Sequence, residues 1–382
     1  MPPFFDPTPE EKAALDALAA QLPGIQRTLT ANHAQLTAAD RGAHQMQLAA
    51  SRVTLSVADH LPPALDGLGV FVRGATHVGI GRISTGLGCP HAETDADFLG
   101  LMVAFRTAAG RRIDFITIND PTSPTDTPEE FIALLKATAD AAGSEGLFVS
   151  QARLLGSLLR HAGARAPAIA LHVTAQTLRT VRSRTAYQQY WTGIVRARDV
   201  LGKFTFVPTT PAAPGHGTAR GPRHFTDDWR ERQRTGALEF ALHWIPFVSE
   251  RSTPLADLTA PWTDAQQVRV GTVVFPRLDP DAPEAKMVQL LAQELRANPG
   301  NWQETSEGGD VLPATRFTAS RVLAYRASQD NRHALADDQY QAFFERGEIG
   351  PALAAELVRR YNVKREAGHW APDVGPSPIE RG

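Results

Sequence analysis

The sequence has a single cysteine, little lysine, no excess of charge of either sign and no long apolar run. Cys89 is the only cysteine in 382 residues, which excludes an intramolecular disulfide and any metal or cluster site built from cysteines alone. Lys and Arg number 39 against 41 Asp and Glu, a formal net charge of -2. With no global positive field to attract nucleic acid or anionic lipid, we expect no nucleic-acid partner.

The N-terminal segment gives no sign of a targeting or membrane signal. Residues 1–22 contain charged side chains at Asp6, Glu10, Glu11, Lys12 and Asp16 and no long apolar stretch, so we expect neither a signal peptide nor membrane insertion. A lone cysteine fits a reducing compartment. The expected location is therefore cytoplasmic.

Arginine is the residue that the chain has in excess. Only five of the 39 basic residues are lysine, which leaves 34 arginines. The planar guanidinium group pairs well with carboxylates and phosphates, but a base bias across a whole genome would produce the same ratio. Composition alone leaves both interpretations open.

Helices and short strands are predicted to form one core. Thr8 to Glu11 reads as a capping box that starts an amphipathic helix in an N-terminal arm, residues 1–37. Alternating apolar residues predict strands at 51–58, 77–85, 100–107, 112–119, 168–175, 203–209, 238–247 and 268–276. Helices are expected at 129–142, 147–162, 316–326, 334–346 and 351–363.

The order of these elements predicts the fold class. Late strands must pair with early ones to close a sheet, so one α+β core is favoured over two independent domains. We expect a closed antiparallel β-barrel within residues 38–312, wrapped by helices. Residues 313–370 would add C-terminal helices, followed by a flexible tail at 371–382.

Three partial matches to common binding motifs lack residues that those motifs require. Gly79-Ile-Gly81 lacks the third glycine and the acidic residue of a dinucleotide fingerprint. Gly202-Lys203 lacks the other residues of a phosphate-binding P-loop. Cys89 and His91 lack the paired spacing of a metal site.

Four short patterns, each uninformative alone, occur along the chain in an order and at separations that are informative together. They are Arg41-Gly-Ala-His44, Ile80-Gly81-Arg82-Ile83-Ser84, the stretch from Asp114 through Asn119 to Pro121, and Arg321-x-x-x-Tyr325 with Arg332 beyond it. Together they resemble the haem catalase superfamily over roughly residues 38–130 and 200–335. The resemblance is closest to the short catalase-related haem proteins, which keep the barrel and lack the long C-terminal domain of catalases.

This resemblance implies a catalase-like fold that binds haem b. Tyr325 would supply the iron ligand through its phenolate oxygen. An ordinary phenol has a pKa near ~10, and the charge of Arg321, one helical turn earlier, would favour the phenolate. Arg41, Arg82 and Arg332 match the positions that bind the two haem propionates, a task that suits guanidinium geometry.

The resemblance also implies three catalytic residues. His44 would move a proton between the two oxygens of a bound peroxide, and Asn119 would orient that peroxide. Ser84 would hold the other ring nitrogen of His44 and so select its tautomer. Taken alone, His44 is better explained as an exposed histidine and Asn119 as a turn cap before Pro121.

Two departures from the family pattern shape the expected activity. Thr122-Ser123-Pro124 stands where the family has an aromatic pair, and Leu99-Gly100 replaces an Arg-Gly pair. Unless Phe71, Phe98 or Phe115 fills the space, we expect a wide distal pocket that favours peroxidatic or organic-hydroperoxide chemistry over rapid oxygen release. No NADPH site is expected.

The expected function is a haem enzyme that reduces or rearranges hydroperoxides: a peroxidase, a weak catalase, or a hydroperoxide isomerase or lyase. Its partner would be a small peroxide or organic hydroperoxide, and assembly into a homo-oligomer is left open. A non-catalytic haem sensor or carrier is the main alternative, against which the presence of His44 and Asn119 argues. A thiolate haem enzyme using Cys89, after Gly86-Leu-Gly88, is a third, and the strand-rich middle of the chain contradicts it.

Overall fold

A closed β-barrel forms the centre of the computed structural model, which describes residues 5–33, 40–107, 110–143, 147–180, 185–209, 221–302, 313–369, 371–372 and 374. Antiparallel neighbours follow the order β5-β4-β3-β2-β1-β9-β8-β7, and a further β5–β7 pairing closes the ring. The short β6 continues along β7 beyond β5. The strands are β1 (Gln47–Val57), β2 (Thr76–Thr85), β3 (Leu99–Arg106), β4 (Arg112–Ile118), β5 (Tyr190–Thr192), β6 (Val195–Ala197), β7 (Val200–Pro208), β8 (Leu238–Pro246) and β9 (Val268–Phe275).

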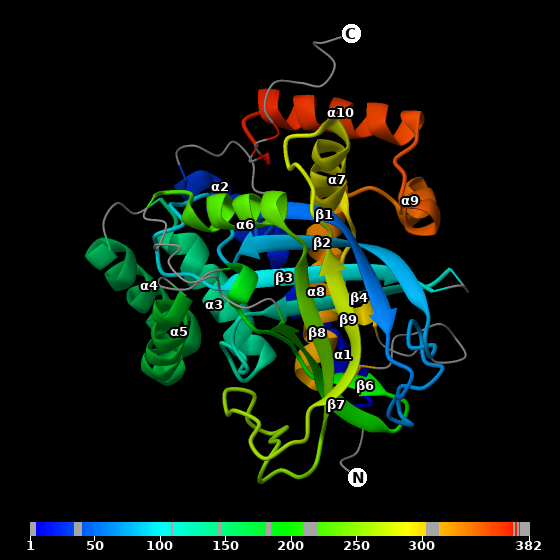
Figure 1. Cartoon of the computed structure of the whole chain (residues 1–382). Helices are drawn as coiled ribbons and strands as arrows, with labels where there is room; N and C mark the ends of the chain where they lie inside the picture. Colours follow the sequence, from blue (N-terminus) through cyan, green and yellow to red (C-terminus); the bar gives the residue numbers. More distant parts are fainter. Residues whose placement is uncertain are drawn as a thin grey trace.

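Helices surround this barrel, as predicted for an α+β fold. Figure 1 shows α10 lying across the top of α7, while α4 and α5 stand together at the left edge. The helices are α1 (Pro9–Ala19), α2 (Leu22–Asn32), α3 (Pro128–Ala141), α4 (Leu147–Ala162), α5 (Ala166–Thr180), α6 (His224–Thr235), α7 (Pro283–Glu294), α8 (Arg316–Asn331), α9 (Gln341–Arg346) and α10 (Pro351–Glu366). None of those described is long and apolar enough to cross a bilayer.

Most of the predicted elements are present, and one is wrong. The capping box is confirmed, because the Thr8 hydroxyl accepts from the Glu11 amide at 3.2 Å and the Glu11 carboxylate accepts from the Thr8 amide at 3.0 Å. The strand expected at 168–175 is instead part of helix α5. The β-branched residues of this segment favoured the strand prediction. In the structure, Ile169 and Val173 recur at helical spacing and pack on α3 and α4.

Several elements and ranges fall outside those predictions. Helices α2, α6 and α7 and the short strands β5 and β6 were not predicted. Helices α1 and α2 of the arm pack against α3 and α8. Most of the expected tail at 371–382 lies outside the described residues.

Aromatic side chains fill the inside of the barrel. Phe71 stacks on Phe204 with ring centroids 5.5 Å apart, and Phe115 meets Phe204 edge-on at 5.1 Å. Trp302 covers the same group at 4.8 Å from Phe204. A barrel of this size is just wide enough for its own side chains, so a ligand site has to lie outside it.

The register of the strands builds rows of side chains on the outer face of the barrel. Side chains alternate between the two faces of a strand, so residues two apart on β2 share the outer face. One row is Arg82, Met102 and Ile116, and the next is Ser84, Gly100 and Ile118. Sheet pairing therefore brings together residues that the sequence separates by some twenty positions.

A buried ion pair ties the barrel to the segment that leads into α8. The Arg112 guanidinium donates to both Asp114 oxygens, at 3.1 and 2.6 Å, and to the Tyr340 hydroxyl at 2.6 Å. The Asp114 carboxylate also accepts from the Asn298 amide at 2.9 Å. Both charged side chains are almost completely buried, so removing Arg112 leaves the Asp114 carboxylate without its cationic partner.

We predict that Arg112→Met lowers the free energy of unfolding by about 3 to 5 kcal/mol, the usual cost of leaving a buried partner charge unpaired. Urea unfolding followed by circular dichroism measures the change. Arg73→Met is the matched control, because Arg73 pairs with Asp66 at the surface and its loss should leave stability close to wild type. Equal losses in the two variants would contradict the prediction.

Candidate functional site

A cavity of about 920 Å³ separates helix α8 from the outer face of the barrel. Strands β2 to β4 form one wall and α8 forms another. Residues of α3, α5 and β5, and of the loops before β1, before β3 and after β4, contribute to the rest of the lining. Seven of the eight predicted site residues line it: Arg41, His44, Arg82, Ser84, Arg321, Tyr325 and Arg332. The eighth, Asn119, does not contribute to its wall.

Local geometry holds His44 in one orientation. Its backbone has a φ of 55°, uncommon for a residue other than glycine, and its amide donates to the Gly86 carbonyl at 2.8 Å. The Nδ1 atom lies 3.1 Å from the Ser84 hydroxyl, as the resemblance implied. The ring lies so close to Gly100 that a Cβ there would stand 2.6 Å from the imidazole Cε1. Glycine at position 100 is thus a steric requirement.

The surroundings of His44 keep its imidazole neutral. Burial lowers its pKa to about 4, and the charges of Arg82, Arg321 and Arg41 add to this effect against that of Asp97. The group is uncharged at neutral pH. It is therefore able to accept a proton.

Asp97 organises the loop that supports His44. Its carboxylate accepts hydrogen bonds from the amides of Gly86 and Leu87 at 2.8 and 2.9 Å and lies 3.2 Å from His91 Nε2. Although burial opposes charge on His91, this contact raises the pKa of His91 to about 9. The sequence alone indicated no role for Asp97.

Arg41, Arg82 and Arg332 converge on one glutamine of α7. Arg41 and Arg332 donate to the Gln293 carbonyl at 2.7 and 3.0 Å, and Arg82 donates to its side-chain oxygen at 3.3 Å. Arg332 also donates to the Leu295 carbonyl at 2.6 Å. Sequence reasoning missed Gln293, because nothing near it in the chain distinguishes it from other helix glutamines.

These three guanidinium groups lack carboxylate partners. Within the part of the chain that the structure describes, none of them forms an ion pair, and Arg41 Nε is buried without a hydrogen bond. Burial and the charge of Arg332 lower the pKa of Arg41 and bring that of Arg82 to about 9. Such a cluster favours a ligand that carries negative charge, and two carboxylates suit it well.

Tyr325 and Arg321 lie on one face of α8, a helical turn apart. The Arg321 guanidinium carbon is 5.8 Å from the centre of the Tyr325 ring, and no described residue forms a hydrogen bond with the phenol oxygen. A Cβ at Gly193 would stand 2.9 Å from Arg321 Nη1. Arg321 therefore lies over the ring, and its expected support of a phenolate stays a prediction.

Asn119 occupies a different place from the one that its expected role requires. Its side-chain oxygen accepts from the Leu99 amide at 2.8 Å, and its side-chain nitrogen donates to the Thr180 hydroxyl at 2.9 Å. Its neighbours Ile118 and Asp120 line the cavity, whereas Asn119 does not. In this conformation the Asn119 amide is not available to a peroxide in the cavity.

Cys89 lies in the cavity wall as a packed thiol. Burial, with the charges of Asp97 and Asp95, raises its pKa to about 12, which opposes the thiolate that iron ligation needs. Its neighbours in the apolar cluster include Leu22 and Leu29. The described residues contain no group of three or more His, Cys, Asp or Glu arranged as metal ligands.

The loop that departs from the family pattern does face the cavity. Thr122 and Ser123 line the wall, and their small side chains fit the expected wide pocket. Of the three phenylalanines considered as substitutes, only Phe98 reaches the cavity. Phe71 and Phe115 belong to the barrel core.

Solved structures of catalases share this fold. Over 79%, 81% and 82% of this chain, a fungal catalase, a bacterial catalase and catalase A from Saccharomyces cerevisiae match with TM-scores of 0.58, 0.58 and 0.60. Sequence identity is 14%, 17% and 14%, and the chain spans 60%, 60% and 65% of their length. No family model and no curated protein matches the sequence. The likeness shows a catalase-like α+β barrel fold.

We predict that His44 makes the cofactor-free protein sensitive to acid. The imidazole pKa is about 4 in the folded protein against an ordinary 6.5, so between these values the unfolded chain binds a proton that the folded chain does not. The free energy of unfolding should then fall as the pH drops from 6.5 towards 4. Urea unfolding across this pH range should show a smaller fall in the free energy of unfolding for His44→Gln than for wild type. If the free energies of the two proteins fell in parallel with pH, His44 would not be the group responsible.

Proposed function

We propose that this protein is a haem enzyme that processes peroxides and prefers organic hydroperoxides to hydrogen peroxide. The observation that carries the proposal is the arginine cluster. Its three guanidinium groups have no carboxylate partner among the described residues, and they border the cavity that Tyr325 and His44 also line. The catalase-like fold supports the same function. A reducing, cytoplasmic location belongs to the same proposal, and the oligomeric state is left open.

The residues present fit haem b. Arg41, Arg82 and Arg332 would bind its two propionates, and the Tyr325 oxygen, which has no other partner among the described residues, would bind the iron. Bound haem supplies the redox chemistry that cleaves an oxygen–oxygen bond. The raised pKa of Cys89 leaves the phenol as the better anionic ligand.

His44 has the chemistry of a proton carrier. Because Nδ1 is held by Ser84, the free atom for proton transfer is Nε2. A neutral imidazole accepts the proton of one peroxide oxygen at this atom and returns it to the other oxygen, which promotes uneven cleavage of the bond between them. Ser84 and Gly100 fix the plane of the ring and therefore the direction of this transfer.

A haem sensor or carrier without turnover is a second candidate. The position of Asn119 favours it, because the amide expected to orient a peroxide is bound to Leu99 and Thr180. The presence of a neutral His44 that is hydrogen-bonded to Ser84 favours an enzyme, because binding of haem alone requires neither residue. Turnover of a peroxide by the purified protein decides between them.

We predict that Tyr325→Phe removes the iron ligand and leaves the propionate site intact. Haemin should bind with an altered visible spectrum or be lost, while iron-free protoporphyrin IX, which has the same carboxylates, should bind as it does to wild type. Absorption and fluorescence titrations measure both. Cys89→Ser is the control and should leave the spectrum unchanged; an effect of Cys89→Ser with none of Tyr325→Phe would assign the ligand to the thiol.

We also predict that, at equal haem content, the protein consumes cumene hydroperoxide faster than it releases oxygen from hydrogen peroxide. The small side chains of Thr122 and Ser123 admit a larger molecule and hold a second peroxide poorly. Substrate loss and an oxygen electrode measure the two rates. His44→Ala should keep its haem and slow cleavage by ~10²–10⁴-fold, whereas catalase-like oxygen release with no organic turnover would exclude this preference.

A further inference from the structure

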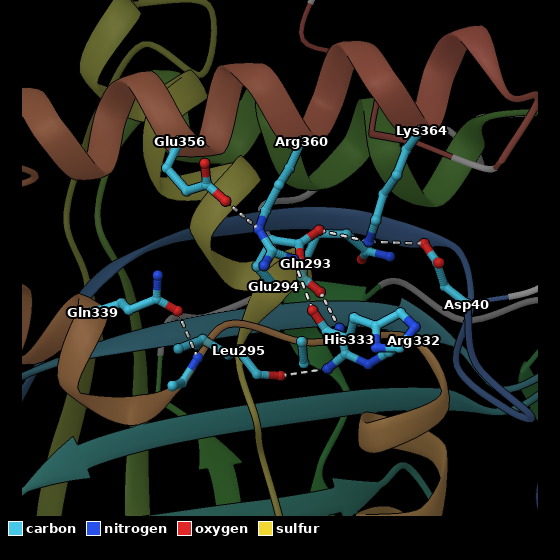
Figure 2. Close-up of polar contacts among 12 residues, drawn as sticks. Asp40, Gln293, Glu294, Leu295, Arg332, His333, Gln339, Glu356, Arg360 and Lys364 are labelled. Atoms are coloured by element: carbon cyan, nitrogen blue, oxygen red, sulfur yellow. Dashed lines mark hydrogen bonds and ion pairs between the residues drawn. The ribbon is translucent and has the colours of Figure 1, made fainter.

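Two buried carboxylates stand between the arginine cluster and helix α10. Asp40 immediately precedes Arg41, and Glu294 immediately follows Gln293; their exposed fractions are 2% and 4%. Lys364 of α10 contacts both, with Nζ 2.7 Å from Glu294 Oε1 and 3.3 Å from Asp40 Oδ2. Figure 2 shows this lysine pointing from α10 to the two carboxylates, with Arg332 on their other side.

Each carboxylate has a second polar partner from the C-terminal segment. Arg360 Nη1 lies 3.2 Å from Glu294 Oε2, and its Nε donates to Glu356 at 2.8 Å. His369 Nδ1 lies 3.1 Å from Asp40 Oδ1. Although burial opposes ionisation, contacts with His369 and Lys364 hold the pKa of Asp40 at about 2, so Asp40 is negatively charged at neutral pH.

The charges therefore alternate in layers from the cavity outwards. The three arginines come first, then the pair of carboxylates, then the cations of α10 with Glu356 outermost. Asp40 and Glu294 also act electrostatically on Arg41 and Arg332. If the α10 cations were lost, the two carboxylates would no longer be neutralised from that side, and they would compete with any anion in the cavity for Arg41 and Arg332.

We propose that α10 sets the affinity of the cavity for a dicarboxylate ligand: Lys364 and Arg360 hold Asp40 and Glu294, and so leave Arg41 and Arg332 available. These are positioning residues, because they act through the arginines and do not reach the ligand. This inference rests on the proposed function, because it identifies the carboxylates of the ligand with the haem propionates.

Apolar packing holds α10 in place without these ion pairs. Leu357, Val358 and Tyr361 are buried in a cluster with residues of α7, α9 and the outer face of the barrel. Loss of the Lys364 charge should therefore change the charge balance of the site and leave the helix docked. An effect on ligand affinity can thus be separated from an effect on folding.

The test titrates the cofactor-free protein with iron-free protoporphyrin IX, followed by its fluorescence, and with haemin, followed by absorbance. Lys364→Met should bind both about tenfold more weakly, the size expected when one unit charge is removed from a partly buried site, and Lys364→Arg should restore binding. Arg359→Met is the matched control, because Arg359 lies on the same helix and pairs with Glu356 alone. Melting temperatures and circular dichroism show whether each variant is folded.

Glu294→Gln tests the sign of the effect. Because it removes negative charge beside the arginines, it should bind protoporphyrin at least as tightly as wild type, and Glu294→Gln with Lys364→Met should bind more tightly than Lys364→Met alone. General loss of structure cannot produce opposite shifts in the two single variants. Wild-type affinity in Lys364→Met, or equal weakening in both single variants, would overturn the inference.

Failure of the proposed function has a different signature. If wild type binds neither porphyrin, the proposed function fails, and succinate, a small dicarboxylate, becomes the probe. A ligand that binds the folded protein raises its melting temperature. The inference then requires a smaller succinate-induced rise in Lys364→Met than in Arg359→Met, and equal rises would reject it.

Discussion

The burial of three like charges around one glutamine is the constraint on which the rest of the site depends. Arg41, Arg82 and Arg332 all donate to Gln293, and a carbonyl or amide oxygen offers only partial negative charge to three full positive ones. Because an uncompensated buried charge is costly, the fold supplies two carboxylates behind the cluster. In front of it lies the cavity, where the charges of a bound anion would complete the balance.

The aromatic core of the barrel explains why this cluster lies where it does. Phe71, Phe115, Phe204 and Trp302 fill the interior, so polar chemistry is restricted to the outer face. The rows set by pairing of β2, β3 and β4 then place Arg82 and Ser84 side by side on that face. The same register pairs Gly100 with Ser84. Because Gly100 has no side chain, the His44 ring is able to lie close to the sheet.

The site also joins segments that are far apart in the chain. Arg41 and His44 precede the first strand, Gln293 ends α7, Tyr325 and Arg332 come from α8 or its end, and Lys364 reaches in from α10. Arg41, His44, Tyr325 and Arg332 line the cavity, whereas Gln293 and Lys364 act from behind its wall. The helices outside the barrel are consequently part of the site as well as a cover for apolar surface.

Sequence alone determined the elements whose pattern is local. The capping box at Thr8, the alternation of β1 to β4, and the spacing of Arg321, Tyr325 and Arg332 are readable because one helical turn or one strand carries them, and the order of four short motifs was enough to predict the barrel. Tertiary structure decided what depends on partners elsewhere in the chain. The 168–175 segment became helical because its apolar face packs on α3 and α4. Asn119 is held out of the cavity wall by its hydrogen bonds to the Leu99 amide and the Thr180 hydroxyl. Gln293, Glu294 and Asp40 acquired their roles only through charges brought close by folding. A single sequence shows the type of each side chain, whereas the free energy of a charge depends on the other charges and the burial around it, which exist only in the folded chain.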